Sequence, residues 1–393
     1  MKILYHHRVA SKDGQYVHIE EIIKAFRQLG HEVVVVEPES VNQREFGEGS
    51  RLVSTVRAYI PGFIHELAEF GYSCLEYLKL RKAIIRHRPD VIYERYNLFF
   101  ISGVWAARHF HLPYIVEVNS PLFEERSTHG RLGLKWLARW TETLVWKSAD
   151  YVLPVTAVLA QRVAAAGVPA ERMQVIPNGV NREEFSSVAD GVAMKKQLGI
   201  QQPNVLGFTG FVREWHGLDR VISLMSDSDL EDWHFLVVGD GPVKAALQEQ
   251  ARRAGLEQRV TFTGLVNRDT IRDYVSCFDV ALQPDVVDYA SPLKLFEYLA
   301  LGKAVLAPDM ANIREILSND TNASLFDNGS DEDFRCKLAR LCSDSALRDR
   351  LGRNARELLE QKGYYWDENA RLIVYLFQRL LQRFPAPVAL RGK

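Results

Sequence analysis

Residues 291–302, Ser-Pro-Leu-Lys-Leu-Phe-Glu-Tyr-Leu-Ala-Leu-Gly, place a lysine and a glutamate one helical turn apart. Ser291 suits a helix N-cap and Pro292 the first helical position, so we predict that a helix begins here. The backbone N–H groups of its first turn, including that of Leu293, have no partner within the helix and attract phosphate. Lys294 adds a mobile cation to the same turn.

Glu297 follows Lys294 by three residues and shares its helical face. Its neighbours Leu295, Phe296 and Tyr298 are apolar, so the carboxylate is predicted to be half-buried. Burial of a carboxylate is costly unless something donates to it, and two sugar hydroxyls would do so. A phosphate at the helix tip and a ribose one turn along predict a nucleotide-sugar site. The alternative is a Lys–Glu surface pair on an ordinary core helix.

A loop at 209–217, Thr-Gly-Phe-Val-Arg-Glu-Trp-His-Gly, follows a predicted strand and carries two candidate cations. Gly210 allows close approach of the backbone to a ligand. Arg213 and His216 could neutralise the charge that develops on a departing diphosphate. The alternative is that Arg213 pairs with Glu214 and that His216 caps the next helix.

Two further glycine turns follow predicted strands. Gly239 begins a turn similar to the start of a dinucleotide fingerprint, but Lys244 stands where the third glycine would fall, so a structural strand-to-helix turn is favoured. Gly264 and Val266 lie where exposed backbone could contact a nucleotide base, and a purely structural turn explains them equally well.

The first half of the chain offers weaker candidates. Gly14 precedes a predicted helix N-terminus that could make a second phosphate or sugar contact. Asn119 and Ser120 end a strand and are candidate contacts to the transferred sugar or to the acceptor. His18 lies one turn inside this helix and could simply be a packed side chain, and residues 124–126 could equally be contacts or a solvated loop.

Short apolar strands alternate with amphipathic helices along the chain, which predicts parallel sheets covered on both faces. Strands are predicted at 3–5, 33–36, 91–93, 114–118, 151–155, 204–208, 234–238, 260–262, 280–282 and 304–306. The fold class is therefore α/β, with two doubly wound domains facing a cleft. Ligands of such sheets bind beyond the carboxyl ends of the strands.

Domain boundaries are predicted from turn residues near 177–190. Residues 1–182 form the first domain, 183–365 the second, 366–384 a final helix that returns to the first domain, and 385–393 a tail.

Composition restricts the class of protein. A chain of 393 residues suits two domains, and a formal net charge of −1 argues against a nucleic-acid partner. The four cysteines are scattered, and no signal peptide or bilayer-spanning run is recognised, so a cytoplasmic protein is expected. The acidic pairs Asp227/Asp229 and Asp331/Asp333 lie in polar linkers, so no metal site is predicted.

Residues 130–140 interleave basic and aromatic side chains, including Trp136 and Trp140. This segment could lie on an anionic membrane surface or meet a lipid-linked acceptor. A packed helix with a solvated basic face is favoured, because one amphipathic helix rarely anchors a protein without a second signal.

Taken in order, these segments resemble family 4 of the retaining glycosyltransferases, which have the GT-B fold. The resemblance covers nearly the whole chain and rests on modest motifs, which lie at 30–33, 175–180, 210–217, 238–242, 291–300 and 302–305. It implies transfer of a sugar from a UDP- or GDP-linked donor, with retention of anomeric configuration and with no metal or other cofactor. The acceptor would be a glycan, a glycolipid or another glycoconjugate.

The resemblance also implies roles for single residues. Glu297 matches the second glutamate of the family's E-x7-E motif, which binds the donor ribose, whereas Tyr289 stands in place of the first. His216 replaces a lysine that grips the diphosphate, Phe211 replaces an arginine, and Arg213 could supply the lost charge. Asn119 lies near a histidine position that faces the reacting carbon. Because of these departures, a GT-B protein without catalysis and a nucleotide-sugar epimerase are kept as alternatives.

Overall fold

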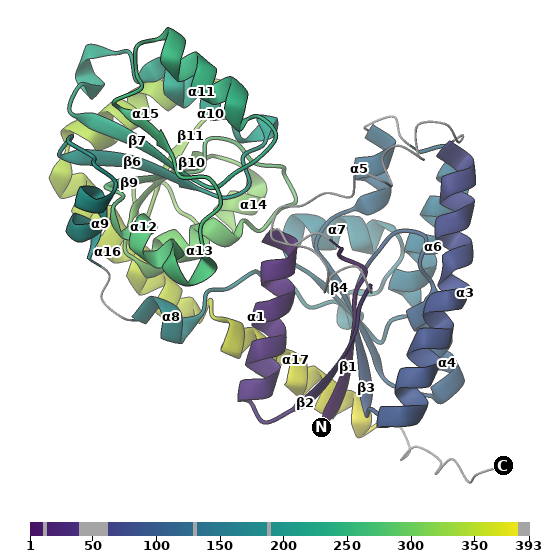
Figure 1. The fold of residues 1–393 in the computed structure, drawn as a ribbon. Helices are drawn as coiled ribbons and strands as arrows, with labels where there is room; N and C mark the ends of the chain where they lie inside the picture. Colours follow the sequence, from purple (N-terminus) through teal and green to yellow (C-terminus); the bar gives the residue numbers. More distant parts are fainter. Residues whose placement is uncertain (11–13, 39–61, 129–131, 187–189, 384–393) are drawn as a thin grey trace. The chain divides into compact units, whose positions relative to one another are not determined.

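The computed structural model describes residues 1–10, 14–38, 62–128, 132–186 and 190–383. The chain divides into two compact units. Unit 1 comprises residues 1–177 and 367–393, and unit 2 comprises residues 178–366. Both are α/β units in which the strands alternate with helices along the chain (Figure 1). Among the described residues, no helix combines the length and the hydropathy needed to cross a bilayer.

Unit 1 contains a parallel sheet of five strands in the order β2-β1-β3-β4-β5. The strands are β1 (Lys2–His6), β2 (Glu32–Val36), β3 (Val91–Arg95), β4 (Tyr114–Val118) and β5 (Tyr151–Pro154). The helices are α1 (Gly14–Gln28), α3 (Gly62–His87), α4 (Ser102–Phe110), α5 (Leu122–Thr128), α6 (Lys135–Ser148), α7 (Ala157–Ala165) and α17 (Trp366–Leu381).

The position of β2 at the edge of this sheet corrects one sequence prediction. Val33, Val34 and Val35 are half-buried rather than buried, because an edge strand lacks a neighbour on one side. The amphipathic region predicted over 53–86 is helical from Gly62, as α3, and its first part lies outside the described residues. The final helix, α17, packs on unit 1, where the ring of Phe377 lies 6.4 Å from that of Tyr93.

Unit 2 contains a parallel sheet of six strands in the order β11-β10-β9-β6-β7-β8. The strands are β6 (Asn204–Thr209), β7 (Trp233–Val238), β8 (Val260–Phe262), β9 (Val280–Leu282), β10 (Ala304–Pro308) and β11 (Ser324–Phe326). The longer helices are α9 (Gly191–Gln197), α10 (Leu218–Leu224), α11 (Lys244–Arg253), α13 (Leu293–Ala300), α15 (Asp331–Ser343) and α16 (Ser345–Lys362). The shorter ones are α8 (Arg182–Ser186), α12 (Ile271–Ser276) and α14 (Ala311–Arg314). The strand predictions did not include β11.

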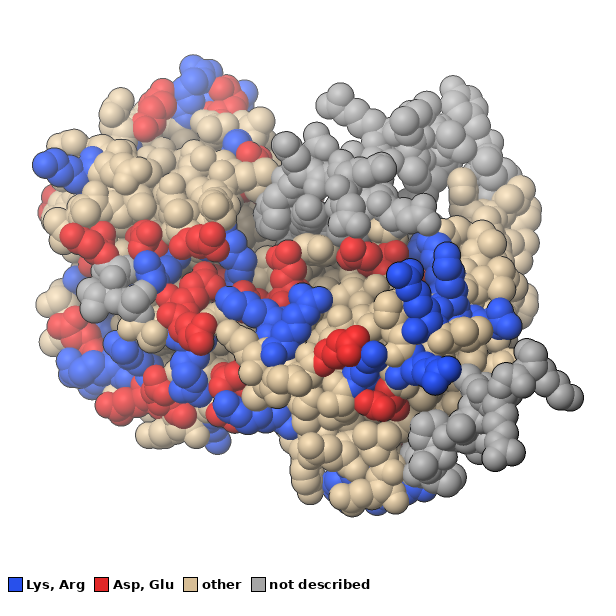
Figure 2. All heavy atoms as spheres, turned by 60° about the horizontal axis from the view of Figure 1, so that its bottom comes forward, with Lys and Arg blue, Asp and Glu red and all other residues tan. Residues whose placement is uncertain are grey.

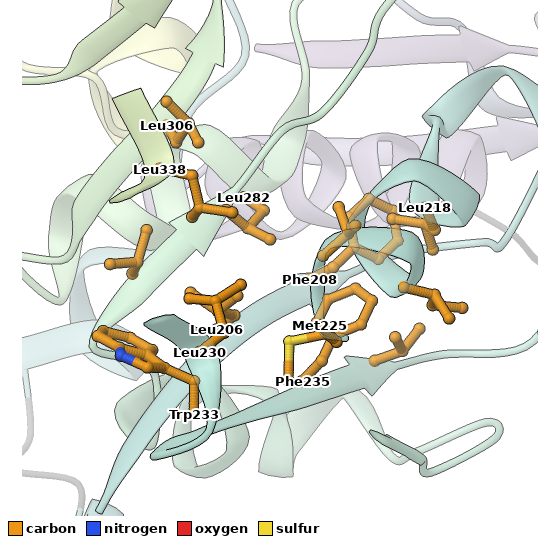
Figure 3. Close-up of a cluster of buried hydrophobic side chains, with 14 of the residues drawn as sticks. Leu206, Phe208, Leu218, Met225, Leu230, Trp233, Phe235, Leu282, Leu306 and Leu338 are labelled. Atoms are coloured by element: carbon orange, nitrogen blue, oxygen red, sulfur yellow. The ribbon is translucent and has the colours of Figure 1, made fainter. Parts of the chain in front are cut away.

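The side chains of β6 alternate between the two faces of this sheet, as the period of two requires. Leu206 and Phe208 enter one core, together with Leu218 and Met225 of the α10 region (Figure 3). Val205 enters the other core, which α13 covers with Leu295, Phe296, Tyr298 and Leu299. The hydroxyl of Tyr298 accepts the backbone N–H of Thr209 at 2.9 Å, which fixes α13 against the carboxyl end of β6.

Candidate functional site

The start of α13 lies one residue later than predicted, and Ser291 does not cap it. Pro292 is the N-cap residue, in extended backbone conformation. The Ser291 hydroxyl instead accepts the backbone N–H of Asn178 at 3.1 Å, and the Asn178 amide donates to the Ser291 carbonyl at 2.6 Å. These two bonds hold the segment in front of the helix. Within the described residues nothing accepts the N–H of Leu293 or Lys294, so both donors are available to a ligand.

Lys294 does not form the Lys–Glu surface pair that was the alternative interpretation. Its ammonium lies 3.8 Å from the centroid of the Phe208 ring. A Cβ at Gly210 would lie 3.2 Å from Lys294 Cε and Nζ, so the glycine leaves the path of this side chain open. Burial lowers the pKa of Lys294 to about 7, and the nearby Glu297 carboxylate only partly opposes that shift. The described residues give this ammonium no ion-pair partner, so a bound anion would stabilise its charged form.

His216 is not the second cation that was expected. Its Nδ1 accepts the backbone N–H of Arg213 at 3.3 Å, at the start of the short 3-10 turn Glu214–His216. Burial, followed by the charges of Lys294 and Arg213, lowers the pKa of His216 to about 2. The imidazole is therefore neutral at pH 7, with its hydrogen on Nε2, and it serves as a hydrogen-bond donor. His216 therefore caps the short turn to which it belongs, and not the next helix, α10, as the alternative interpretation held; the N-cap of α10 is Gly217, which has no side chain.

Arg213 is held by aromatic rings rather than by Glu214. Its guanidinium lies 4.6 Å from the centroid of the Phe211 ring and 4.9 Å from that of Trp215. Stacking on rings leaves the N–H groups of a guanidinium free to donate to an anion. Arg213 and Lys294 both lower the pKa of His216 electrostatically, so the three side chains are close to one another.

Glu297 is more deeply buried than the half-buried position that was predicted, with an exposed fraction of 6%. Its Oε1 lies 3.5 Å from Nη1 of Arg268, in the 3-10 turn Arg268–Thr270. Sequence reasoning missed Arg268, because nothing in the local sequence shows that its turn reaches α13.

The glycine turns of unit 2 pack backbone against backbone. A Cβ at Gly239 would lie 2.0 Å from the Gly210 carbonyl oxygen, and one at Gly241 would lie 2.0 Å from that of Val212. Gly210 N–H and Val212 N–H also donate to Val238 and Asp240 at 3.0 and 2.8 Å. This contact confirms the structural interpretation of the 239–242 turn, which fixes the loop that carries Arg213 and His216.

The third glycine turn is built in the same way. Gly264 adopts φ +71° and forms a bridge with Gly239, while Val266 is half-buried against the core of unit 2. Gly264 therefore lies beside the Gly210–Gly239 contact, and a direct contact of Gly264 or Val266 with a base stays a prediction.

Gly14 and Asn119 belong to unit 1. Gly14 is the first residue of α1, and a Cβ there would meet nothing within 4 Å; residues 11–13 of its loop lie outside the described residues. The amide of Asn119 donates to Glu117 Oε1, so part of its hydrogen-bonding capacity is already used within the protein.

Glu117 is the centre of a buried network that sequence reasoning missed. It accepts from His18 Nε2 at 2.8 Å, from Tyr93 OH at 2.7 Å and from Arg95 Nη1 at 2.8 Å. Burial raises the pKa of this carboxyl, but His18 and Arg95 outweigh burial and hold the pKa well below its usual range. The prediction that His18 is a packed side chain was therefore incomplete, since its ring is paired with Glu117.

The acidic pairs have structural partners. Asp227 pairs with Arg335 at 3.1 Å, and Asp333 accepts the Asp327 N–H at 2.7 Å in the first turn of α15. In the part of the chain that the structure describes, no three His, Cys, Asp or Glu side chains are grouped so that they could hold a metal ion.

The face displayed in Figure 2 carries interspersed cationic and anionic side chains.

Comparison with known proteins identifies relatives of both halves. The family description "Glycosyltransferase Family 4" matches residues 12–184, and "Glycosyl transferases group 1" matches residues 192–358. A 2-deoxystreptamine glucosyltransferase of Streptomyces kanamyceticus is 30% identical over 47% of this chain and 50% of that enzyme. A phosphatidyl-myo-inositol mannosyltransferase of Mycobacterium leprae is 22% identical over 93% of this chain and 92% of that enzyme. The chain thus spans only part of the length of some of these relatives: 50% of the glucosyltransferase, and 59% of an uncharacterized glycosyltransferase of Methanocaldococcus jannaschii.

Solved structures share the fold. The Anabaena protein Alr3699/HepE, crystallised in complex with UDP-glucose, superposes with a TM-score of 0.73 at 19% identity, covering 96% of this chain and 100% of that one. The predicted two-sheet GT-B architecture is thereby confirmed.

Proposed function

Since the chain belongs to the family 4 glycosyltransferases, we propose that it transfers a sugar from a nucleotide-diphosphate donor bound at the Phe208–Lys294 site of unit 2. The observation that carries the proposal is the ammonium of Lys294, which is placed beside free backbone donors and lacks a counter-ion among the described residues. A buried ammonium without an ion-pair partner is costly even with the Glu297 carboxylate nearby, and a bound anion would reduce that cost.

Each residue at the site has a part in this chemistry. The N–H groups of Leu293 and Lys294 and the ammonium of Lys294 hold the diphosphate. Arg213 and the Nε2–H of His216 stabilise the negative charge that grows as the bond between the sugar and the diphosphate breaks. The Glu297 carboxylate accepts from the ribose hydroxyls, one turn further along α13.

The reaction proposed retains the anomeric configuration. The departing diphosphate then assists attack from the face it leaves, so no protein nucleophile is required. The positive charge comes from side chains and backbone, with no metal or other cofactor. Turnover unaffected by a chelator supports this part of the proposal, and recovery of activity only on addition of a divalent cation contradicts it.

The acceptor proposed is a glycan, a glycolipid or a similar glycoconjugate in contact with unit 1, where Asn119 is a candidate contact; Gly14 is a candidate for a second phosphate or sugar contact of the donor. Relatives include an enzyme named for a lipid acceptor and one named for an aminocyclitol, so the family name alone does not choose between them. The proposed cellular location is the cytoplasm.

Calorimetric titration with UDP and with GDP tests the donor site. We expect one of them to bind to the wild-type chain and to bind more weakly to Glu297→Ala. Glu231→Ala, at an exposed position elsewhere in unit 2, is the control. A panel of labelled nucleotide sugars, with and without lipid acceptors, then separates transfer from epimerisation. Absence of binding by either nucleotide contradicts the proposal.

A further inference from the structure

Helices α3 and α6 of unit 1 expose an unusual amount of apolar surface. Thirteen large hydrophobic side chains are exposed among the described residues, and eight of them lie on these two helices. Six are on α3: Phe63, Ile64, Leu67, Leu75, Leu78 and Ile85. The other two are Trp136, which is 69% exposed, and Trp140, which is 48% exposed.

The residues on α3 form a stripe. Ile64, Leu67, Leu75, Leu78 and Ile85 recur at spacings of three, seven or eight residues and so fall on one face of the helix. At a rise of about 1.5 Å per residue, the stripe runs for roughly 30 Å. The inward face of the same helix carries the buried side chains of Glu66, Ser73, Glu76, Leu80 and Ile84.

The stripe and the tryptophans adjoin each other. The Glu66 carboxylate of α3 accepts the N–H of Gly133 at 2.7 Å and that of Leu134 at 2.5 Å, directly before α6. The ring of Phe70 lies 6.2 Å from that of Trp140. Figure 1 shows the two helices beside each other on the outside of unit 1.

The charges on these helices have one sign. The exposed ionisable side chains of α3 and α6 are all basic: Arg81, Lys82, Arg86, Lys135, Arg139 and Lys147. The acidic side chains of the two helices are all buried or paired with groups of the protein. Glu66 accepts the N–H groups of Gly133 and Leu134, Glu69 pairs with Arg126 at 2.7 Å, and Glu76 and Glu142 are buried. This sorting stands out in a chain whose net charge is −1.

We propose that the outward faces of α3 and α6, the α3–α6 surface, bind an anionic lipid bilayer. Apolar and aromatic side chains enter the interface between headgroups and acyl chains, where tryptophan is favoured, and the flanking cations attract anionic headgroups. One amphipathic helix anchors weakly, and α3 supplies the second helix that the segment 130–140 lacked. Pairing of two copies through this surface would oppose cations with cations, which disfavours self-association.

Co-sedimentation of the full chain with vesicles tests the proposal. Vesicles of phosphatidylcholine alone are compared with vesicles that also contain phosphatidylglycerol. We expect binding only to the anionic vesicles, weakened by salt. Lys82→Gln with Arg139→Gln should weaken binding about 25-fold, since each basic residue near an anionic surface contributes about fivefold. Leu78→Ser with Trp136→Ser should also reduce binding.

Matched controls come from exposed positions of the other elements. Lys196→Gln with Lys362→Gln removes the same charge from unit 2, and Val192→Ser with Tyr375→Ser removes apolar area elsewhere; both should bind as the wild type does. Thermal unfolding verifies that every variant folds. The proposal is overturned by equal loss in test and control variants, by no binding to anionic vesicles, or by a dimer that Leu78→Ser with Trp136→Ser converts to a monomer. It is independent of the donor site, because UDP affinity should not change in these variants.

Discussion

Both units carry ionisable groups near the carboxyl ends of their strands, but the two units differ in whether these groups are paired with opposite charges. In unit 1 the charges compensate one another. Glu117 holds His18 and Arg95, while Glu94 accepts from His6 at 2.8 Å and from Tyr114 at 2.9 Å. Burial lowers the pKa of His6, yet Glu94 and Glu76 outweigh it and raise that pKa to about 9, so the ring is a cation with partners.

In the described part of unit 2, Lys294 has no ion-pair partner. Lys294 lies on an aromatic ring, its pKa is lowered to about 7, and Arg213 is stacked on two further rings. A self-compensated network stabilises a fold, whereas an uncompensated cation is a site prepared for an anion. The difference supports the proposal that unit 2 holds the diphosphate, and it can be tested because opposite effects on stability are expected in the two units.

The largest effect expected is on stability, in unit 1. Glu117→Ala leaves Arg95 and His18 buried without their counter-charge, so the free energy of unfolding should fall by about 3–5 kcal/mol. Glu124→Ala, which removes an exposed carboxylate paired with Arg162 at 3.4 Å, should cost less than about 1 kcal/mol. Urea unfolding measures both. A Glu117→Ala variant that keeps its stability but loses turnover would make Glu117 a catalytic residue rather than a structural one.

The corresponding change in unit 2 should reverse the pattern. Lys294→Met removes a charge that burial destabilises, so the free energy of unfolding at pH 7 should stay constant or increase. Turnover should fall by about 10²–10³-fold, the loss typical when one preorganised donor to developing charge is removed. Steady-state kinetics together with urea unfolding measures the pair of effects. Loss of stability without loss of turnover would show that Lys294 only packs against Phe208.

Sequence patterning predicted the strand alternation and the partial burial of Glu297, because both follow from local periodicity, although Glu297 is more deeply buried than predicted. It could not predict the position of the Lys294 side chain, which depends on Gly210 and Phe208 from another strand–loop segment. Nor could it predict the neutral state of His216, which depends first on burial and then on the charge of Lys294. The Ser291 cap was wrong because Asn178, far away in the chain, takes its hydroxyl. Arg268 and the partners of Glu117 were missed for the same reason. Contacts between distant segments determine protonation and side-chain direction, and neither has a periodic signal.

A smaller effect is expected at the far end of the site. Glu297→Ala removes an acceptor for two ribose hydroxyls, and hydrogen bonds to a charged group contribute about 1.5–3 kcal/mol, so UDP or GDP affinity should fall by about 10–100-fold. Titration of the free diphosphate ion pyrophosphate separates the two parts of the site, since its affinity should be unchanged in Glu297→Ala and reduced in Lys294→Met. Equal losses for nucleotide and pyrophosphate would place Glu297 outside ribose binding.

The smallest effect, and the one that most directly probes the uncompensated charge, is the pH dependence of donor binding. The pKa of Lys294 is about 7 in the free protein, and a bound diphosphate would raise it. Above pH 7 binding must therefore take up a proton, so affinity should fall by up to about tenfold per pH unit. The phosphates contribute little there, because their second pKa lies near 6.

The same shift has the opposite sign for the stability of the free protein. Between pH 7 and the unfolded-state pKa of 10.5, the unfolded chain holds a proton on Lys294 that the folded chain has lost, so stability should rise with pH in that window. Lys294→Arg keeps its charge throughout, so its nucleotide affinity should be flat over pH 7–9, while the distant Lys196→Arg should follow the wild type. Wild-type affinity that is equally flat would mean that Lys294 is fully charged before the donor binds, and the contrast between the two units would then rest on Arg213 alone.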